Sequence, residues 1–218
     1  MLEYYPNLRW LLLGIEFFSA LVAFLYLPKL KGSYWKWFAF YLIFIFIQEF
    51  IWKFTHSILE IRKQDYYVYF GIPVQYLFFY WLYASKSLKN KKLFLITSII
   101  YLLTYIPLEI YNQKVKTVYS INLTIGTILL TLLIVLEFMR QIKNDDILKF
   151  KENKMFYMNI GIILFYIGTY PFYSLYNEFL KAPYVHIWNM YFLYSLIANC
   201  IMYLLFTASF IWGKHKSQ

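Results

Sequence analysis

The stretch WFAFYLIFIFIQEFIWKF, residues 37–54, is long and apolar enough to cross a bilayer as one helix, yet Gln48 and Glu49 lie inside it. At 1.5 Å per residue, Glu49 lies about 18 Å from Trp37 along the helix axis. A carboxylate at that depth costs about 2.5–3.5 kcal/mol on insertion scales. We therefore expect Glu49 to face protein or a water-filled cavity rather than lipid.

The composition points to a membrane protein. Of the 218 residues, 61% are hydrophobic and only 15% are charged, which is too little charge to cover the surface of a soluble domain of this size. The formal net charge of +10 comes from short loops between apolar blocks, so it indicates membrane topology and not nucleic-acid binding. The single cysteine, Cys200, excludes an intrachain disulfide.

Seven apolar blocks, each about 20 residues long, predict an all-α, polytopic membrane protein with one seven-helix transmembrane domain over residues 1–218. The first block has no basic leader before it, so we expect it to be retained as a span. Pro73, in the third block, predicts a kink and not a break, because neighbouring helices can satisfy the freed carbonyl. The expected spans are residues 8–27, 37–55, 66–84, 93–112, 118–139, 155–176 and 185–212.

The basic residues predict the orientation. Loops one, three and five and the C-terminal tail hold about two-thirds of the 21 lysines and arginines. The positive-inside rule then places the N-terminus outside and the C-terminus in the cytoplasm. We expect a multi-pass protein of the plasma membrane, the inner membrane of a bacterium.

Polar residues inside the spans are more frequent between the midplane and the outer face than in the inner half. Because buried polar groups must find each other or water, we expect a polar pocket that opens to the outside. Its candidate ligand-binding residues are Glu16, Gln48, Glu49, Gln75, Tyr170, Asn189 and Asn199.

Several of these patterns have purely structural explanations. Glu49 precedes Lys53 by four residues, the favourable order for an ion pair within one helix. Gly161 and Gly168 are spaced as in a packing seam between helices, and small residues let helices approach closely. A stripe of Ser and Thr in the fifth block permits the same interpretation.

Motifs of known enzyme classes are missing from the sequence. It contains no HExxH, GxSxG or Walker A motif, and its three histidines have no metal-ligand spacing. We expect no metal, no cofactor and no catalytic residues. One enzymatic alternative stays open, an intramembrane acid/base hydrolase that uses Glu16 and Glu49, since burial could raise the pKa of one of them.

The segment NDDILKFKENKMFYMNIGIILFYIGTYPF, residues 144–172, leads into a helix with the pattern G-x3-F-Y-x-G-x2-P-F. This pattern resembles small seven-span bacterial membrane proteins that have no characterised activity. The resemblance implies the seven-span layout and a role beside membrane signalling systems. The matching positions are Gly161, Phe165, Tyr166, Gly168, Pro171 and Phe172.

These observations favour a sensor or receptor-like membrane protein. A small cationic or polyhydroxylated ligand would bind the outer pocket, and a cytoplasmic or membrane partner would read the change through the loop Arg140–Lys154. One alternative is a small-solute transporter with a midplane site near Glu16, Ser195 and Asn199. A second alternative is a structural subunit of a membrane complex.

Overall fold

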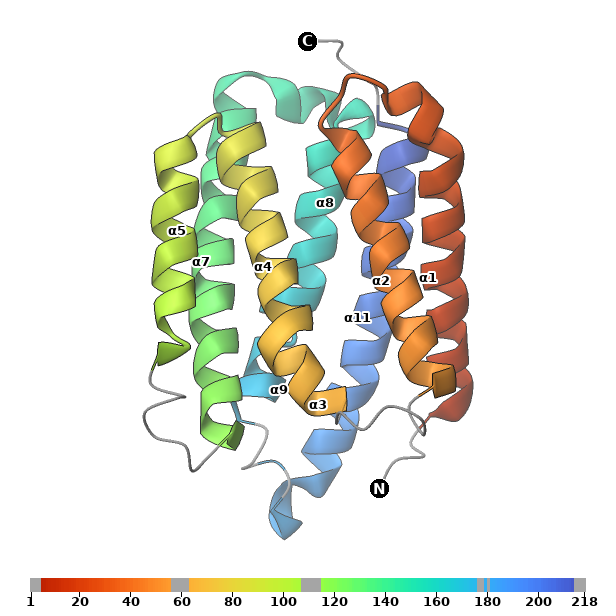
Figure 1. Ribbon diagram of the computed structural model, residues 1–218, viewed down its shortest axis with the longest axis vertical. Coiled ribbons are helices and arrows are strands. Elements are labelled where there is room, and N and C mark those ends of the chain that lie inside the picture. The colour runs from red at the N-terminus through yellow and green to blue at the C-terminus, as the bar shows by residue number, and fades with distance from the viewer. Residues whose placement is uncertain (1–4, 56–62, 107–114, 176–178, 180, 214–218) are drawn as a thin grey trace. The chain divides into compact units, whose positions relative to one another are not determined.

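The computed structural model describes residues 5–55, 63–106, 115–175, 179 and 181–213, and these residues form helices with no strand among them. The chain divides into two compact units, unit 1 with residues 1–60, 146–168 and 189–218 and unit 2 with residues 61–145 and 169–188. Figure 1 labels their helices.

Unit 1 is built from long apolar helices. Helix α1 (Pro6–Tyr26) continues into the 3-10 turn η1 (Leu27–Leu30), and α2 (Trp35–Thr55) packs against α1. The 3-10 segment η4 (Asp146–Glu152) leads into α8 (Lys154–Ile162) and the π-helical turn η5 (Ile163–Ile167). Helix α11 (Val185–Ile211) contributes all but its first turn to this unit.

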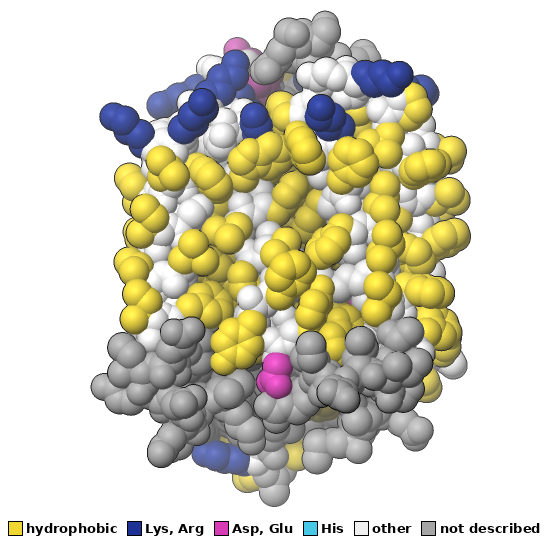
Figure 2. Space-filling view, viewed as in Figure 1, with side chains coloured by type: hydrophobic (Ala, Val, Ile, Leu, Met, Phe, Trp, Pro, Cys, Tyr) yellow, Lys and Arg dark blue, Asp and Glu magenta, His cyan; other side chains and the backbone are white. Residues whose placement is uncertain are grey.

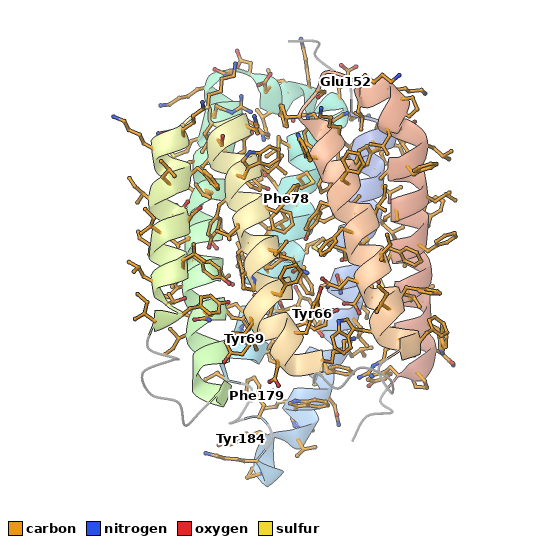
Figure 3. All side chains as sticks on the ribbon, in the orientation of Figure 1. Tyr66, Tyr69, Phe78, Glu152, Phe179 and Tyr184 are labelled. Atoms are coloured by element: carbon orange, nitrogen blue, oxygen red, sulfur yellow. The ribbon has the colours of Figure 1, made fainter. Side chains whose placement is uncertain are left out.

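Unit 2 begins with one continuous helix whose winding changes along its length. Its parts are α3 (Lys63–Tyr66), the π turn η2 (Tyr67–Gly71), α4 (Ile72–Tyr80) and the π segment η3 (Trp81–Ser87). In Figure 3, Tyr66 and Tyr69 come from its first half and Phe78 from its second half. Helices α5 (Lys91–Leu103), α7 (Val115–Lys143) and α9 (Tyr170–Ser174) and the 3-10 turn η6 (Ala182–Tyr184) follow.

The helix of unit 2 passes through Pro73 without a break, as the sequence predicts. Proline lacks an amide hydrogen and its ring collides with the carbonyl four residues earlier. The π turn η2 ends two residues before Pro73, and the amide of Ile72 donates to the carbonyl of Tyr67, five residues back. A widened turn therefore takes up the proline inside the helix.

Aromatic side chains form the core of each unit. In unit 1, the ring of Phe38 on α2 lies 5.4 Å from Phe210 and 5.2 Å from Phe206, both on α11. In unit 2, the rings of Tyr76 and Tyr101 lie 5.2 Å apart, and Tyr80 stacks edge-on against Tyr101. Offset and edge-to-face ring pairs of this kind add to the stabilisation from burial.

Five helices of the described residues are long and apolar enough to cross a membrane: Pro6–Leu30, Trp35–Phe54, Ile121–Lys143, Lys154–Phe172 and Val185–Ile211. Large apolar side chains along them point outward, as expected of helices that face lipid. On the face shown in Figure 2, hydrophobic side chains cover the helices, and lysines and arginines lie at helix ends. The chain thus has the features of a multi-pass membrane protein.

These five helices match five of the seven expected spans within a few residues. The helix Lys63–Ser87 corresponds to the expected third span but is not among the five. Helix α5 begins where the fourth span is expected, and the part of that span after Ile106, with Pro107, lies outside the described residues. The sixth expected span contains η5 and a turn at Gly168 and Thr169, so it is not one regular α-helix.

Candidate functional site

Glu16 lies near the middle of α1 and its side chain is only 5% exposed. The buried face of α1 around it carries small side chains, those of Ser19, Ala20 and Ala23. Small residues let neighbouring helices come close, so the acid is enclosed by protein. This agrees with the expectation that an acid within a span avoids lipid.

Two tyrosines and a cysteine interact electrostatically with Glu16. They are Tyr41 on α2 and Tyr203 and Cys200 on α11. The hydroxyl of Tyr41 is also hydrogen-bonded to Tyr166 on η5. Two other helices of unit 1 thus carry groups that interact with the acid on α1.

Glu49, on α2, also acts on Tyr203. Its side chain is half-buried, and it interacts electrostatically with Tyr203. The two acids that the sequence singles out therefore share one electrostatic partner. The nearby Lys53 ammonium lies 4.3 Å from the centre of the Trp10 ring, a cation–π contact that keeps the lysine at the edge of the helix.

Three predicted site residues of unit 1 carry amide side chains, and they lie at different depths. Gln48 is 4% exposed, whereas Asn189 and Asn199 are half-buried on α11. Within the described residues, no donor reaches the buried side-chain oxygen of Asn189 or of Asn199. Buried acceptors of this kind usually bond to water or to a ligand.

A hydrogen-bonded link holds α1 against α11 next to the acid. Ser19 Oγ lies 2.6 Å from Thr207 Oγ1, and it also donates to the carbonyl oxygen of Tyr203 at 2.9 Å. Both side chains are buried. The link fixes the position of Tyr203 relative to Glu16, three residues before Ser19.

The two glycines of the sixth expected span are packing positions, which confirms the structural explanation. A Cβ on Gly161 would lie 3.3 Å from the Phe206 ring and 3.4 Å from Met202. A Cβ on Gly168 would collide with the hydroxyl of Tyr194, which donates to the carbonyl of Leu164 at 2.9 Å. This close approach of α11 holds η5, and with it Tyr166, in place.

Two predicted site residues, Gln75 on α4 and Tyr170 on α9, belong to unit 2, where both are half-buried. The polar interior of unit 2 is formed mainly by other residues. Tyr76 Oη lies 2.8 Å from Thr127 Oγ1, and Tyr80 donates to the carbonyl of Gly126 at 2.9 Å. These contacts tie α4 to α7.

A buried carboxylate in unit 2 was not among the predicted site residues. Glu137 on α7 is fully buried and accepts hydrogen bonds from Ser87 at 2.8 Å and from Gln141 at 3.0 Å. Arg140 donates to both carboxylate oxygens, at 2.7 and 3.0 Å, and its Nη2 also donates to Ser87 at 3.2 Å. A charge-assisted fork of this kind is among the stronger polar contacts in proteins.

A second buried charge lies in unit 1. Lys154, the first residue of α8, is 4% exposed, and its Nζ lies 5.3 Å from the centre of the Trp35 ring and 5.9 Å from that of Phe210. Lys154, Glu137, Gln141 and Ser87 all lie at helix ends that border the basic loops. Of these four, only Glu137 lies within an expected span, so the comparison of the two halves of the spans, from which the outer pocket is predicted, stays a prediction.

Among the described residues, no three His, Cys, Asp or Glu side chains lie close enough to hold a metal ion. His186 lies exposed in the first turn of α11. His56 and His215 lie outside the described residues, as does Glu109. The candidate site residues of the described chain carry carboxylates, phenols and amides.

The comparisons with known proteins give no relative. No family model matches the chain, and neither a curated protein nor a solved structure is significantly similar to it.

Proposed function

We propose that this chain is a seven-span membrane protein that binds a small cation beside Glu16 and passes the signal to a partner protein. Beyond the five long apolar helices, the helix Lys63–Ser87 extends about 37 Å, enough to cross a hydrocarbon core of about 30 Å. Helix α5 provides the start of the remaining span. The distribution of basic loops supports an N-terminus outside and a C-terminus in the cytoplasm.

The burial of Glu16 next to Tyr203 carries the proposal: Glu16 is 5% exposed, and Ser19, one turn later on α1, donates to the carbonyl oxygen of Tyr203 at 2.9 Å. Glu49 on α2 also interacts electrostatically with Tyr203. A charged acid within a membrane span is costly, and residues of this kind usually mark a ligand, ion or proton path. Here two acids of one unit both interact electrostatically with Tyr203, and Tyr41, which also interacts with Glu16, is hydrogen-bonded to Tyr166.

The chemistry of these side chains favours a cationic ligand. Carboxylates attract positive charge, and the faces of tyrosine rings bind ammonium and guanidinium groups through cation–π contacts. Asn199, next to Cys200, adds a side-chain oxygen without a donor among the described residues. A ligand with N–H groups suits this acceptor together with the carboxylate of Glu16.

The segment between α7 and α8 supports the proposed output to a partner. Within Arg140–Lys154, η4 carries Leu148 with 76% of its surface exposed, next to the exposed Phe150. Phe150 stacks on Phe156 of α8, and Tyr157 donates to the carbonyl of Lys151 at 2.9 Å. The segment is thus held in one conformation while it presents apolar side chains.

A solute transporter is the second candidate, and Asn199 favours it. Asn199 lies on α11 next to Cys200, which interacts with Glu16, and its side-chain oxygen has no donor among the described residues. Polar groups near the midplane are typical of transporter sites. Ligand binding without flux distinguishes a receptor from a transporter.

The test uses the purified full chain and three cations: tetramethylammonium, guanidinium and putrescine. We expect at least one of them to raise the unfolding temperature of the wild type, and Glu16→Gln to abolish that shift. The control Glu152→Gln removes an exposed acid of the same unit and should keep the shift. No shift with any of the three cations would refute the cation site.

Flux is measured in proteoliposomes with the cation that gives the shift, in labelled form. Binding without uptake supports the receptor. Saturable uptake that Glu16→Gln abolishes supports the transporter and overturns the receptor.

A further inference from the structure

The turn that joins η3 to α5 in unit 2 has one well-defined conformation. The amides of Leu88 and Asn90 donate to the carbonyls of Tyr83 and Ala84, both at 2.8 Å. Lys89 adopts a left-handed conformation with φ of 55°, and the side chain of Asn90 caps α5 by accepting from the amide of Leu93 at 3.0 Å. The turn is held by backbone and cap bonds, so its conformation does not depend on the lysine side chains.

Four lysines occupy this turn: Lys86, Lys89, Lys91 and Lys92. The last three are exposed, and Lys86 is half-exposed with its Nζ 5.3 Å from the centre of the Trp81 ring. No acidic residue occurs between Trp81 and Leu103. Two of these lysines stand in the first turn of α5, where the helix dipole disfavours positive charge. Helix stability therefore does not explain them.

Neighbouring α7 adds positive charge to the same end of unit 2. Arg140 donates to Ser87, beside Lys86, and the exposed Lys143 follows one turn later. The acids here are Glu137, which is buried and bonded to Arg140, and the exposed Asp145. The surface formed by Lys86, Lys89, Lys91, Lys92 and Lys143, the lysine surface, keeps a net positive charge.

Apolar side chains continue directly from the lysine surface along α5. Leu95, Ile96 and Ile99 begin one turn after Lys92, and each exposes more than half of its surface. A single molecule that lies along this helix would meet positive charge at one end and an apolar surface beyond it. A phospholipid has this arrangement, with an anionic headgroup followed by acyl chains. An acidic soluble peptide would bind the lysines but would leave the apolar side chains of α5 uncovered.

We propose that the lysine surface of unit 2 binds the headgroup of an anionic phospholipid whose acyl chains lie against α5. Lys86 lies in the last turn of the helix Lys63–Ser87, and Lys89, Lys91 and Lys92 follow it within five residues. These lysines therefore lie at the level of the lipid phosphates when that helix crosses the bilayer. Juxtamembrane lysine clusters attract anionic lipids, by about fivefold in affinity for each lysine. This site is separate from the cation site around Glu16.

The test counts lipids retained by the purified full chain in native mass spectrometry. Detergent micelles contain phosphatidylglycerol or phosphatidylcholine at equal mole fraction. We expect preferential retention of phosphatidylglycerol, and at least a tenfold weaker affinity for it in K89A/K91A/K92A. Arg140 is left unchanged because it holds Glu137. The control K31A/K149A/K151A removes the same charge from exposed lysines of unit 1 and should bind as the wild type does.

Further variants and competitors identify which chemical group the lysine surface recognises. Replacement of the same three lysines by arginine should preserve binding, and Glu16→Gln should leave it unchanged. Excess glycerol 3-phosphate should not displace the lipid, and full displacement would show a site for free phosphate instead. The proposal is overturned if the wild type retains the two lipids equally. It is also overturned if both triple variants lose the same affinity for phosphatidylglycerol, or if the protein binds a polyglutamate peptide more strongly than phosphatidylglycerol.

Discussion

Arg140 donates to both carboxylate oxygens of Glu137, a side chain with no exposed surface. The pair lies within one helix, and Ser87 joins it from another helix of unit 2. The desolvation of the buried carboxylate is offset by these hydrogen bonds, so loss of a single partner leaves a charge that is costly to bury.

Replacement of Arg140 by methionine should therefore destabilise the protein by about 2–3 kcal/mol. The cost is smaller than for a fully enclosed pair because a third of the Arg140 side chain is exposed. Unfolding of the purified protein by sodium dodecyl sulfate in mixed micelles measures the change. Lys143→Met, one turn later and exposed, should change stability by less than about 0.5 kcal/mol. Equal effects of the two variants would contradict the structural role of the pair.

Gly126 provides the second prediction, because the ring of Tyr76 lies against it. A Cβ at residue 126 would lie 2.8 Å from the ring, and Tyr76 is held there by its bond to Thr127. Gly126→Ala should cost about 1–3 kcal/mol through overpacking. Gly14→Ala is the matched control, since nothing lies within 4 Å of its Cβ position and alanine favours a helix. A neutral Gly126→Ala would show that the Tyr76 ring can move aside.

Hydropathy alone predicts much of the fold. The expected first span, residues 8–27, corresponds to α1, and the expected last span, 185–212, corresponds to α11. The burial of Glu16 also follows from sequence, because the cost of an acid in lipid is large and local. The bilayer sets both the length of a span and the cost of a charge within it. Both features can therefore be predicted from a single segment of sequence.

The network around Glu137 could not be predicted in this way. Its partner Ser87 is fifty residues away in the sequence, and only tertiary structure brings the two together. An acid beside an arginine at the end of a span is usually a surface pair. Two weak features of the sequence indicate this buried network: Ser87 in the basic turn, and Gln141 one turn after Glu137.

The π turns lay equally beyond sequence analysis. Pro73 indicates a disturbance of the helix, but the choice between a kink and a widened turn depends on how neighbouring groups satisfy the backbone. The structure selects a widened turn at Tyr67–Gly71. That choice changes which residues after the turn face the interior, and so it affects any site predicted from helical periodicity alone.

Lys154 supports a third prediction. Its charge lies between the rings of Trp35 and Phe210, and its stem is buried. Lys154→Met keeps the stem and should cost about 1–2 kcal/mol from the lost cation–π contacts, whereas Lys154→Ala should cost more because it also leaves a cavity. Lys149→Met, at an exposed site of η4, serves as the control. A methionine variant more stable than the wild type would show that burial of the charge outweighs its contacts with the rings.

Tyr203 gives the fourth prediction, which rests on the proposed cation site. Tyr203→Phe removes the hydroxyl that interacts electrostatically with Glu16 and Glu49 and keeps the ring. The lost hydroxyl should reduce the binding free energy by about 1 kcal/mol. The Kd for the cation that stabilises the wild type should therefore rise by about fivefold. Calorimetric titration of the purified protein measures that Kd, and Tyr184→Phe, at an exposed tyrosine, should leave it unchanged. If Tyr203→Phe keeps the affinity and Glu16→Gln loses it, the cation binds Glu16 away from α11. If both variants keep the affinity, the proposed cation site is refuted.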